Sequence, residues 1–428
     1  MFSALESLNL GLYKPLIFKA LILFIIISCI CSFYLLFPLL STVISFFGSK
    51  IKLKEPANSA DFACVITVYK EKDIAWPLVR ALLAQDYPHF HIYLVADGIT
   101  ENMDSMVHDK LTLYQPSPFL NSKVASLGLV LDKMKESHSH VVVFDPDNLV
   151  PRHFLRVISK FHASGYMAVQ GKRIAKNIAG TYAALDALGE YYYDFAVRNI
   201  PFLLGSSSTI AGSGMSIEKN LYSKNIAKEL LVLKEQGVVV AEDKSLQSEL
   251  VDQGHKIAYA AAAIIFDEKI TAATQIGRQR GRWLNSYFGQ LPGALKLFVN
   301  GVLKFDWNRI YFALMTAMPP MVFLVGTSCL LAIAALFVNW SYFFLLGGSL
   351  VLFALGFLLL LLLNKTPQKV LNAIPKIPLF VLGQISGMLN IRKANKDFMA
   401  TTHNEITEIG PLWEARKKEF KHLEKFWQ

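Results

Sequence analysis

Cysteine and charge are both scarce in this chain. Its 428 residues include only 4 Cys, and charged residues make up 18% of it against 53% hydrophobic ones. So few cysteines in so long a chain exclude a disulfide-built scaffold, and we interpret Cys29, Cys31, Cys64 and Cys329 as small apolar side chains. The apolar excess also excludes a disordered chain, and the sequence has no internal repeat that would indicate a solenoid.

Three long stretches are almost free of charge. Between residues 16 and 47 the only charged side chain is Lys19, and residues 310–338 and 341–363 contain none. A helix that crosses a bilayer needs about 20 apolar residues. A charge at its centre costs roughly 2.5–3.5 kcal/mol on insertion scales. The sequence therefore predicts three membrane-spanning helices.

The first stretch is interpreted as one long anchor helix, in which Pro38 could introduce a kink. A cleaved signal peptide is the alternative, but such peptides have apolar runs of about 7–15 residues followed by a small-residue cleavage site. In the second stretch, Pro319-Pro320 is expected to kink or shorten the helix, because proline lacks the backbone N–H that a helix needs.

Lysine and arginine are concentrated beside these stretches, and they predict the orientation of the helices across the membrane. They are Lys50, Lys52 and Lys54, then Arg278, Arg280, Arg282, Lys296, Lys304 and Arg309, then Lys365 and Lys369. Because cytoplasmic flanks carry such an excess, the middle region and the C-terminus are predicted inside, and the uncharged link Asn339-Trp340 outside. The net charge of +10 indicates contact with membrane lipids and an anionic substrate. Nucleic acid is not expected as a partner, because no basic helix or RNA-binding motif stands apart from these flanks.

The chain is expected to have five parts. They are a membrane anchor (1–54), an α/β domain (55–275), an amphipathic interface segment (276–306), a transmembrane hairpin (307–363), and an interfacial helix with a cytoplasmic tail (364–428).

Two further segments are expected to lie at the membrane surface. Residues 277–302 mix basic and aromatic side chains, which is typical of an amphipathic helix on the inner leaflet. Residues 378–390 are apolar but too short to span, so we expect an interfacial or re-entrant helix there. The tail from residue 394 is charged and is predicted to be a solvated helix.

The middle region alternates short apolar runs with helical patterns, which predicts a parallel α/β sheet. The expected strands are 62–68, 91–95 and 141–144, and the expected helices are 73–85 and 121–135. In such sheets ligands bind beyond the carboxyl ends of the strands. Acidic residues follow two of these strands, and they are Asp97 and the pair Asp145 and Asp147.

The sequence Asp145-Pro146-Asp147 places two carboxylates beyond the third strand. Residues i and i+2 of an extended chain point the same way, and Pro146 ends the strand. Two carboxylates so close repel each other unless a cation lies beside them, and Mg²⁺ or Mn²⁺ suits carboxylate and phosphate oxygens. A plain capping turn before Pro151 is the alternative.

Two later motifs carry further polar groups. Glu242-Asp243 precedes a helical pattern at 246–253, where the acids could favour the helix dipole or act as a general base. In Gln279-Arg280-Gly281-Arg282-Trp283, arginine can bind a diphosphate through two parallel hydrogen bonds, and tryptophan offers a flat face for a sugar ring. A basic, aromatic membrane flank is the alternative for this motif.

The order of these motifs resembles the membrane-bound family 2 glycosyltransferases, which include cellulose, chitin, hyaluronan and poly-N-acetylglucosamine synthases. The resemblance covers residues 60–283, and its most specific part is Gln-Arg-Gly-Arg-Trp. It implies a GT-A nucleotide-sugar-binding domain with a Rossmann-like mixed sheet, flanked by transmembrane and interfacial helices. It also implies an inverting transfer from a nucleotide sugar, with UDP as the expected nucleotide and Mg²⁺ or Mn²⁺ as the cofactor.

The resemblance also implies roles for particular residues of this sequence. Asp243 is expected to be the catalytic base, and Asp145 and Asp147 are expected to hold the metal. The residues expected to bind the nucleotide sugar are Tyr69, Glu71, Asp97, Lys123, Asp145, Arg280 and Arg282. Those expected to bind the acceptor are Gly212, Ser213, Gly214, Glu242, Gln279 and Trp283.

The expected product is a growing polysaccharide. The alternative is a glycolipid, made by adding one sugar to ceramide or a polyprenyl phosphate. Three spans are few for a chain that also exports a polymer, which leaves room for an accessory export subunit. A non-catalytic membrane adaptor is a remote alternative, because every acidic motif is intact.

Overall fold

The computed structural model describes residues 14–48, 53–55, 60–101, 103, 108–239, 241–271, 273–378, 381 and 406–427, without the side chains of residues 14, 273–278 and 282. The chain divides into two compact units. One consists of Met1–Phe47 with Met318–Asn364, and the other of Gly48–Ala317 with Lys365–Gln428. We call them the membrane unit and the catalytic unit.

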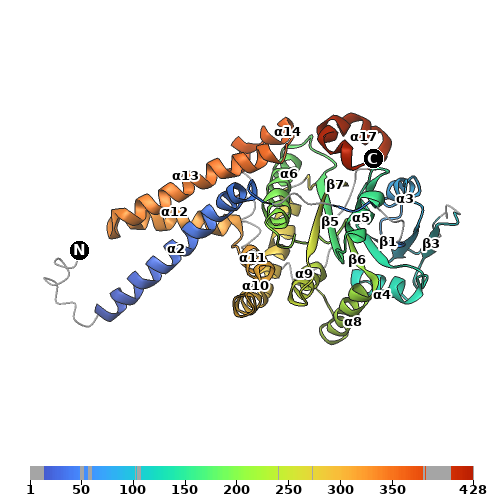
Figure 1. Cartoon of the computed structure of the whole chain (residues 1–428), viewed down its shortest axis with the longest axis horizontal. Helices are drawn as coiled ribbons and strands as arrows, with labels where there is room; N and C mark the ends of the chain where they lie inside the picture. The colour runs from blue at the N-terminus through green and yellow to red at the C-terminus, as the bar shows by residue number, and fades with distance from the viewer. Residues whose placement is uncertain are drawn as a thin grey trace. The chain divides into compact units, whose positions relative to one another are not determined.

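The membrane unit contains three apolar helices, α2 (Lys14–Ser45), α12 (Met321–Val338) and α13 (Trp340–Leu363) (Figure 1). Each is long and apolar enough to cross a membrane, so the three long apolar helices expected from the sequence are present. α2 continues through Pro38 as one helix. Small residues allow close packing, because a Cβ on Gly356 would lie 3.1 Å from the Cβ of Leu39.

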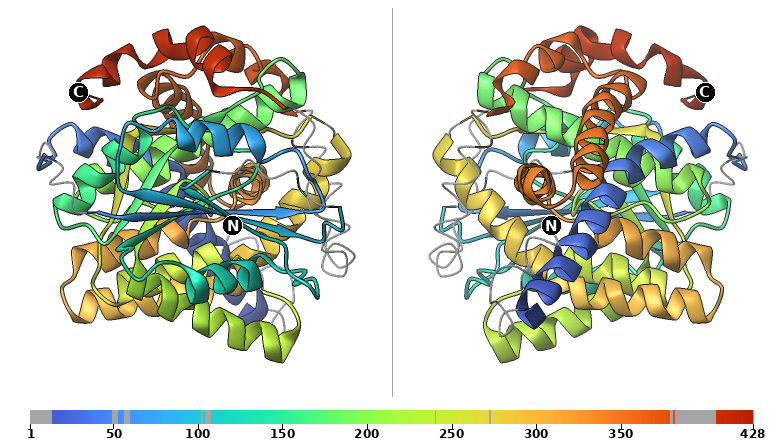
Figure 2. Two further views of the ribbon diagram at one scale, coloured as in Figure 1. Left: turned by 90° about the vertical axis from the view of Figure 1, so that its right-hand side faces the viewer. Right: turned by 90° about the vertical axis from the view of Figure 1, so that its left-hand side faces the viewer.

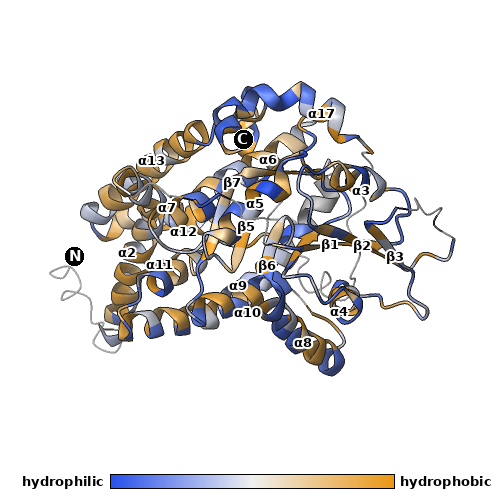
Figure 3. Ribbon diagram, turned by 45° about the vertical axis from the view of Figure 1, so that its right-hand side comes forward, coloured by the Kyte–Doolittle hydropathy of each residue, from blue (hydrophilic) through white to orange (hydrophobic). Residues whose placement is uncertain are grey.

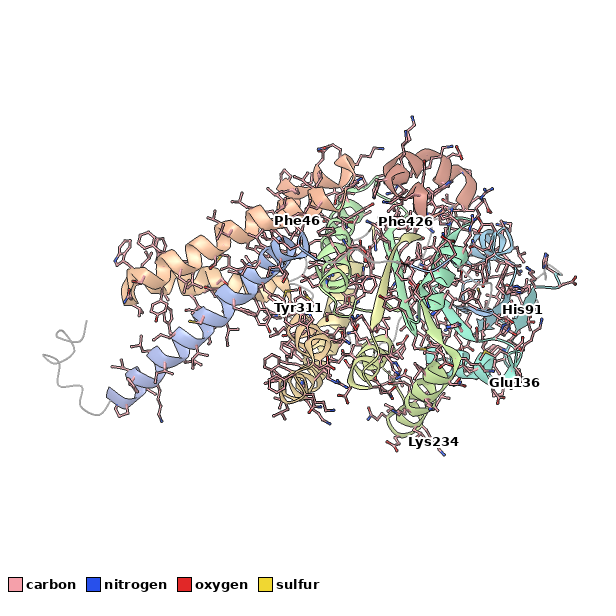
Figure 4. All side chains as sticks on the ribbon, viewed as in Figure 1. Phe46, His91, Glu136, Lys234, Tyr311 and Phe426 are labelled. Atoms are coloured by element: carbon pink, nitrogen blue, oxygen red, sulfur yellow. The ribbon has the colours of Figure 1, made fainter. Side chains whose placement is uncertain are left out.

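The second span begins later than the sequence suggested. Pro319-Pro320 separates two helices, and Pro320 is the N-cap of α12. The preceding helix, α11 (Trp307–Thr316), belongs to the catalytic unit, whereas the expected hairpin began at residue 307. Tyr311, labelled in Figure 4, is 2% exposed, and Phe312 is fully buried in the core of that unit. The run was misjudged because a buried soluble helix is as apolar as a span.

The catalytic unit is built on a seven-stranded sheet in the order β3-β2-β1-β4-β6-β5-β7. The antiparallel β6 pairs with β4 and β5, and the other pairings are parallel. The strands are β1 (Phe62–Tyr69), β2 (Phe90–Asp97), β3 (Leu111–Tyr114), β4 (His140–Phe144), β5 (Ala168–Ala175), β6 (Met215–Glu218) and β7 (Ile257–Asp267). The three strands expected from the sequence are confirmed within two residues at each end.

Helices cover both faces of this sheet (Figure 2). On one face, α4 (Lys123–Lys133), α8 (Lys219–Gln236) and α9 (Glu242–Asp252) pack on the strands, with α10 (Ala273–Leu303) beside α9. On the other face lie α5 (Phe154–Ala163) and α6 (Thr181–Tyr193). The remaining elements are α3 (Trp76–Leu83), the π-helix η1 (Asp194–Asn199), α7 (Ile200–Leu203), α14 (Gln368–Leu371) and η2 (Ile374–Lys376). α10 is amphipathic along its length (Figure 3).

The C-terminal segment packs on the catalytic unit, and so the predicted solvated tail is wrong for residues 409–427. It forms α17 (Ile409–Arg416) and the 3₁₀ helix η3 (Lys417–Phe426). The indole of Trp427 donates to the carbonyl of Ala262 at 3.1 Å, and Arg416 donates to the carbonyl of Ala175. The segment thereby covers part of β7, an edge strand whose backbone would otherwise be open to pairing. The interfacial helix predicted at 378–390 lies almost wholly outside the described residues.

Two neighbouring histidines, whose rings are tilted by 37° to each other, are expected to make the catalytic unit sensitive to acid. The rings of His140 and His162 are 3.8 Å apart, and burial lowers the pKa of His140 from 6.5 to about 4. Burial, and then the neighbouring His140, also hold the pKa of His162 well below its ordinary value. The unfolded chain binds protons that the folded one does not, so stability falls as the pH drops from about 6.5 towards 4.

We expect unfolding experiments to show that the loss of stability between pH 7 and pH 4.5 is smaller in His140→Gln than in the wild type by on the order of 2–3 kcal/mol, the contribution of this one ring. The exposed His89 supplies the control, since His89→Gln should keep the wild-type slope. An unchanged slope in the His140 variant contradicts this account.

Candidate active site

The polar residues expected from the sequence gather at the carboxyl edge of the sheet. β1 ends at Tyr69 and β2 at Asp97, and these two residues are paired in register. β4 ends just before Asp145, and Val143 pairs with Met215, the first residue of the antiparallel β6. The loop that leads into β6 therefore lies at the same edge.

One loop links the first two strand ends to α4. A carboxylate oxygen of the buried Asp97 accepts from the backbone N–H of Leu120 at 2.8 Å. The hydroxyl of Tyr69 donates to the side-chain oxygen of Asn121 at 3.1 Å. This loop leads directly to Lys123, the first residue of α4. Glu71 follows β1 at the same edge.

Lys123 joins three parts of the site. Its ammonium lies 2.9 Å from a carboxylate oxygen of Asp145 and 3.6 Å from one of Glu242. It also donates to the carbonyl of Gly212 at 3.3 Å. Residues from α4, the end of β4, the loop before β6 and the start of α9 thus meet at one cation.

The electrostatics of this cluster are those of partly buried, opposed charges. Burial favours the neutral amine of Lys123, but the carboxylates of Asp145 and Glu242 more than offset it, and the pKa of Lys123 is raised. Burial raises the pKa of Glu242, Lys123 opposes that rise and Asp243 adds to it, and the net direction is upward. An ammonium at this position can neutralise an anionic group that approaches the strand ends.

Asp243 lies in the first turn of α9, beside the loop before β6. A Cβ added to Gly212, whose φ is +80°, would lie 3.5 Å from the Oδ2 of Asp243. Lys244 places its ammonium 3.3 Å from the same carboxylate and donates to the carbonyl of Ile210 at 2.5 Å. The N-cap residue Ala241 has a φ of +61°, a strained conformation for a non-glycine residue. The backbone here is held in a shape that presents Asp243 to the loop.

The three small residues of that loop have different surroundings. Gly212 faces Asp243, whereas Ser213 is fully buried. A Cβ on Gly214 would lie 2.4 Å from the side chain of Ile265, so this position requires glycine for packing. Of the predicted acceptor-binding residues in the loop, Gly212 is the one whose Cβ position approaches the predicted base.

The turn after β4 is fixed by backbone hydrogen bonds. The Oδ2 of Asp147, which is 3% exposed, accepts from the N–H of Glu268 at 2.8 Å, and its carbonyl accepts from Lys176 at 3.1 Å. Among the described residues no group of three or more His, Cys, Asp and Glu side chains could hold a metal ion. Asp145 and Asp147 have oxygen donors that suit Mg²⁺ or Mn²⁺, so a diphosphate and water would have to complete the coordination.

α10 carries the last predicted motif. Arg280 forms a 2.6 Å ion pair with Asp186 of α6, and its guanidinium lies 4.1 Å from the ring centre of Trp283. Trp283 itself is 49% exposed. Gln279 is half-buried, and the side chain of Arg282 lies outside the description. The guanidinium of Arg280 is therefore paired with another residue of the protein, and this ion pair orients the helix that bears Trp283.

Sequence reasoning missed a buried charged network beneath these residues. Arg173 on β5 forms a 2.7 Å ion pair with Asp267, which also pairs with Lys269 at 2.8 Å. Lys269 reaches Glu190 at 3.3 Å, and Glu190 pairs with Arg198 at 2.6 Å. The only signal in the sequence was a pair of cations, Lys172 and Arg173, within an otherwise buried strand.

A family model described as "Glycosyltransferase like family 2" matches residues 59–286, more than half of the chain. The chain belongs to glycosyltransferase family 2. The expected resemblance is confirmed, and so is the expected fold class, a mixed α/β sheet of the GT-A kind in a chain with apolar helices. The matched range of this family 2 enzyme contains every residue of the cluster around Lys123. A search of curated proteins found no match.

A search of solved structures found matches at low sequence identity. The mannosyltransferase PcManGT from Pyrobaculum calidifontis, in complex with GDP-Man and Mn²⁺, is 14% identical with a TM-score of 0.49, and the match covers 85% of this chain and 99% of that one. Residues 1–349 of TarS from S. aureus, in complex with UDP-GlcNAc, are 13% identical with a TM-score of 0.38, and the match covers 81% of this chain and 94% of that one.

Proposed function

We propose that this family 2 enzyme is a membrane-embedded, inverting glycosyltransferase that uses a UDP-sugar donor. The observation that carries the proposal is the meeting of Asp145, Lys123, Glu242 and the loop at Gly212 at the carboxyl edge of the sheet, with Asp243 against that loop. A cation between strand-end acids suits a diphosphate, and a carboxylate beside a glycine turn suits a hydroxyl nucleophile.

The proposed reaction has one displacement step. Asp243 takes the proton of an acceptor hydroxyl while that oxygen attacks the anomeric carbon from the face opposite the diphosphate. The bond between the anomeric carbon and the diphosphate oxygen breaks, and the nucleoside diphosphate leaves with both bonding electrons. Lys123 stabilises the negative charge that develops on the leaving group. One base suffices, and the configuration at the anomeric carbon inverts.

We assign the cofactor site to Asp145 and Asp147, whose carboxylates suit a hard divalent cation. Bound Mg²⁺ or Mn²⁺ would supply positive charge beside the diphosphate. Tyr69, Glu71 and Asp97 are proposed to hold the nucleotide. Tyr69 and Asp97 end the two strands whose ends contact the loop before Lys123, and Glu71 follows the first of them. Gln279, Trp283 and Arg282 remain proposed contacts to acceptor and diphosphate.

The membrane arrangement supports an acceptor at the inner leaflet. Lysine and arginine of the catalytic unit flank the apolar helices in the sequence, so we propose that this unit is cytoplasmic. α10 exposes apolar side chains, among them Phe288, Leu295 and Val299, which suit contact with lipid.

The expected acceptor is a growing polysaccharide, and one observation favours the lipid acceptor instead. Within the described part of the membrane unit, the buried polar side chains belong to serine, threonine and Asn364, and the described helices bring no charged pair into the bundle. A sugar path through a bilayer needs polar lining. A polysaccharide product would therefore require spans from an accessory subunit, whereas a glycolipid would not.

The test is a donor screen on the purified full-length protein in lipid vesicles. Labelled UDP-glucose, UDP-N-acetylglucosamine and GDP-mannose are offered with Mg²⁺ or Mn²⁺ and a total lipid extract, and the products are extracted and sized. We expect nucleotide release and a labelled product from a UDP-sugar. A ladder indicates a polysaccharide, and a single extractable species indicates a glycolipid. No release from any donor would refute the proposed function.

A further inference from the structure

The buried Arg173 joins two parts of the candidate site that are far apart in the sequence. One nitrogen of its guanidinium donates to the carbonyl of Ala211 at 2.6 Å, and another donates to Asp267 at 2.7 Å. Ala211 precedes Gly212, the residue that faces Asp243. Arg173 therefore holds the loop that lies beside the predicted base.

The second contact leads to the turn that carries the strand-end acids. The other carboxylate oxygen of Asp267 accepts from the side-chain amide of Asn148 at 3.1 Å, and the oxygen of that amide accepts from the N–H of Asp145 at 3.1 Å. A continuous chain of hydrogen bonds thus runs from Ala211 through Arg173, Asp267 and Asn148 to Asp145.

Neighbouring charges keep the charged residues between Ala211 and Asp145 ionised, and burial keeps this chain of hydrogen-bonded residues in place. Arg173 and Asp267 have side chains that are only 16% and 9% exposed. Burial alone would raise the pKa of Asp267, but Arg173 and Lys269 lower it to about 2, so the carboxylate stays ionised. Gln170 on the same strand accepts from the N–H of Ala211 at 2.9 Å and donates to the carbonyl of Ser213 at 3.1 Å. β5 therefore fixes both sides of the Ala211 peptide.

We propose that Arg173 is a positioning residue that sets the distance between the acceptor loop at Gly212 and the donor-binding turn at Asp145. This inference rests on the proposed function of the site. Its planar fork can donate to two oxygens in fixed directions, which a lysine ammonium cannot reproduce. Because the contacts are to a loop carbonyl and a structural carboxylate, the effect should fall on the transfer step and leave donor binding intact.

The test compares Arg173→Met and Arg173→Lys with Arg416→Met. Arg416 is a matched control, because its side chain is also largely buried (8% exposed against 16% for Arg173), donates to the carbonyl of Ala175 and pairs with Glu419, but serves the C-terminal segment. Full-length variants in vesicles are assayed with the donor and lipid extract that give product in the screen. Both transfer and acceptor-free nucleotide release are measured.

We expect Arg173→Met to lower kcat for transfer by roughly tenfold with a donor KM within about threefold of the wild type. Acceptor-free nucleotide release should fall less than transfer, and Arg173→Lys should recover part of the transfer rate. Arg416→Met should lower the melting temperature without changing the ratio of release to transfer.

Three results would overturn the inference. The first is a wild-type transfer rate in Arg173→Met. The second is a change in the ratio of nucleotide release to transfer that is as large in Arg416→Met as in Arg173→Met. The third is a donor KM that rises in Arg173→Met as much as kcat falls. If the methionine variant does not fold, the lysine variant decides, and full transfer by it contradicts the inference. A wild-type protein without any donor turnover removes the proposed function itself, which distinguishes that failure from the others.

Discussion

Asp243→Asn is expected to lower the rate of sugar transfer by roughly a thousandfold, because a positioned general base contributes about 10²–10⁴ to such reactions. Asparagine has nearly the same shape as aspartate but cannot accept the proton of the acceptor hydroxyl. The backbone around Ala241 and Gly212 should keep its geometry, since both residues owe their positive φ to the fold. Donor affinity should remain, as Lys123 and Asp145 are untouched.

The measurements are initial rates of transfer and donor-induced thermal stabilisation of the same protein. Asp252→Asn is the matched control, because Asp252 ends the same helix and its side chain is 52% exposed. It should transfer at the wild-type rate. Near-normal transfer by Asp243→Asn would assign the base to another residue, and Glu242 would be the first to examine because its pKa is raised by burial.

Removal of divalent metal is expected to lower transfer by roughly a hundredfold, which corresponds to about 3 kcal/mol of transition-state stabilisation. Chelation with EDTA should abolish most turnover, and added Mg²⁺ or Mn²⁺ should restore it. UDP should raise the melting temperature less in EDTA than in metal, because the diphosphate completes the coordination. This second readout does not depend on turnover.

Asp147→Asn should shift the metal concentration needed for half-maximal activity upwards. Asparagine keeps a side-chain oxygen that can still accept from the N–H of Glu268, so the turn should hold. Asp132→Asn on the exposed face of α4 is the control and should behave as the wild type. Full activity of the wild type in EDTA would contradict the assignment of Asp145 and Asp147 and leave Lys123 as the principal source of positive charge.

Local patterns predicted much of this protein correctly. Apolar runs predicted β1, β2 and β4, and long uncharged runs predicted α2, α12 and α13. These predictions succeed because a segment that is buried in a sheet, or is suited to lipid, needs apolar side chains at consecutive positions of the chain. The strand-end acids were predicted for the same reason, since parallel strands expose their carboxyl ends at one edge. The structure brings Lys123 and Asp145, expected to bind the donor, together with Glu242, expected to bind the acceptor, and these roles stay predictions.

Contacts between distant segments could not be read in this way. Arg280 lies in a motif that suggests diphosphate binding, yet a partner on α6, Asp186, holds it. The charge of the C-terminal segment predicted a solvated helix. In the structure, however, its aromatic rings Trp413, Phe420 and Trp427 cluster and pack against β7 and His153. In both cases the deciding partner is more than 90 residues away in the chain.

The sequence by itself determined the family, the long apolar helices and which acids end or follow the strands β2 and β4. These depend on residue types and on periods of a few residues. Only the tertiary structure decided which charged side chains pair and that α11 is a separate helix of the catalytic unit. It also showed that Arg173 links Ala211 to Asp145 through Asp267 and Asn148. The physical reason is that a buried charge needs a partner, and which partner it finds depends on the packing of the sheet.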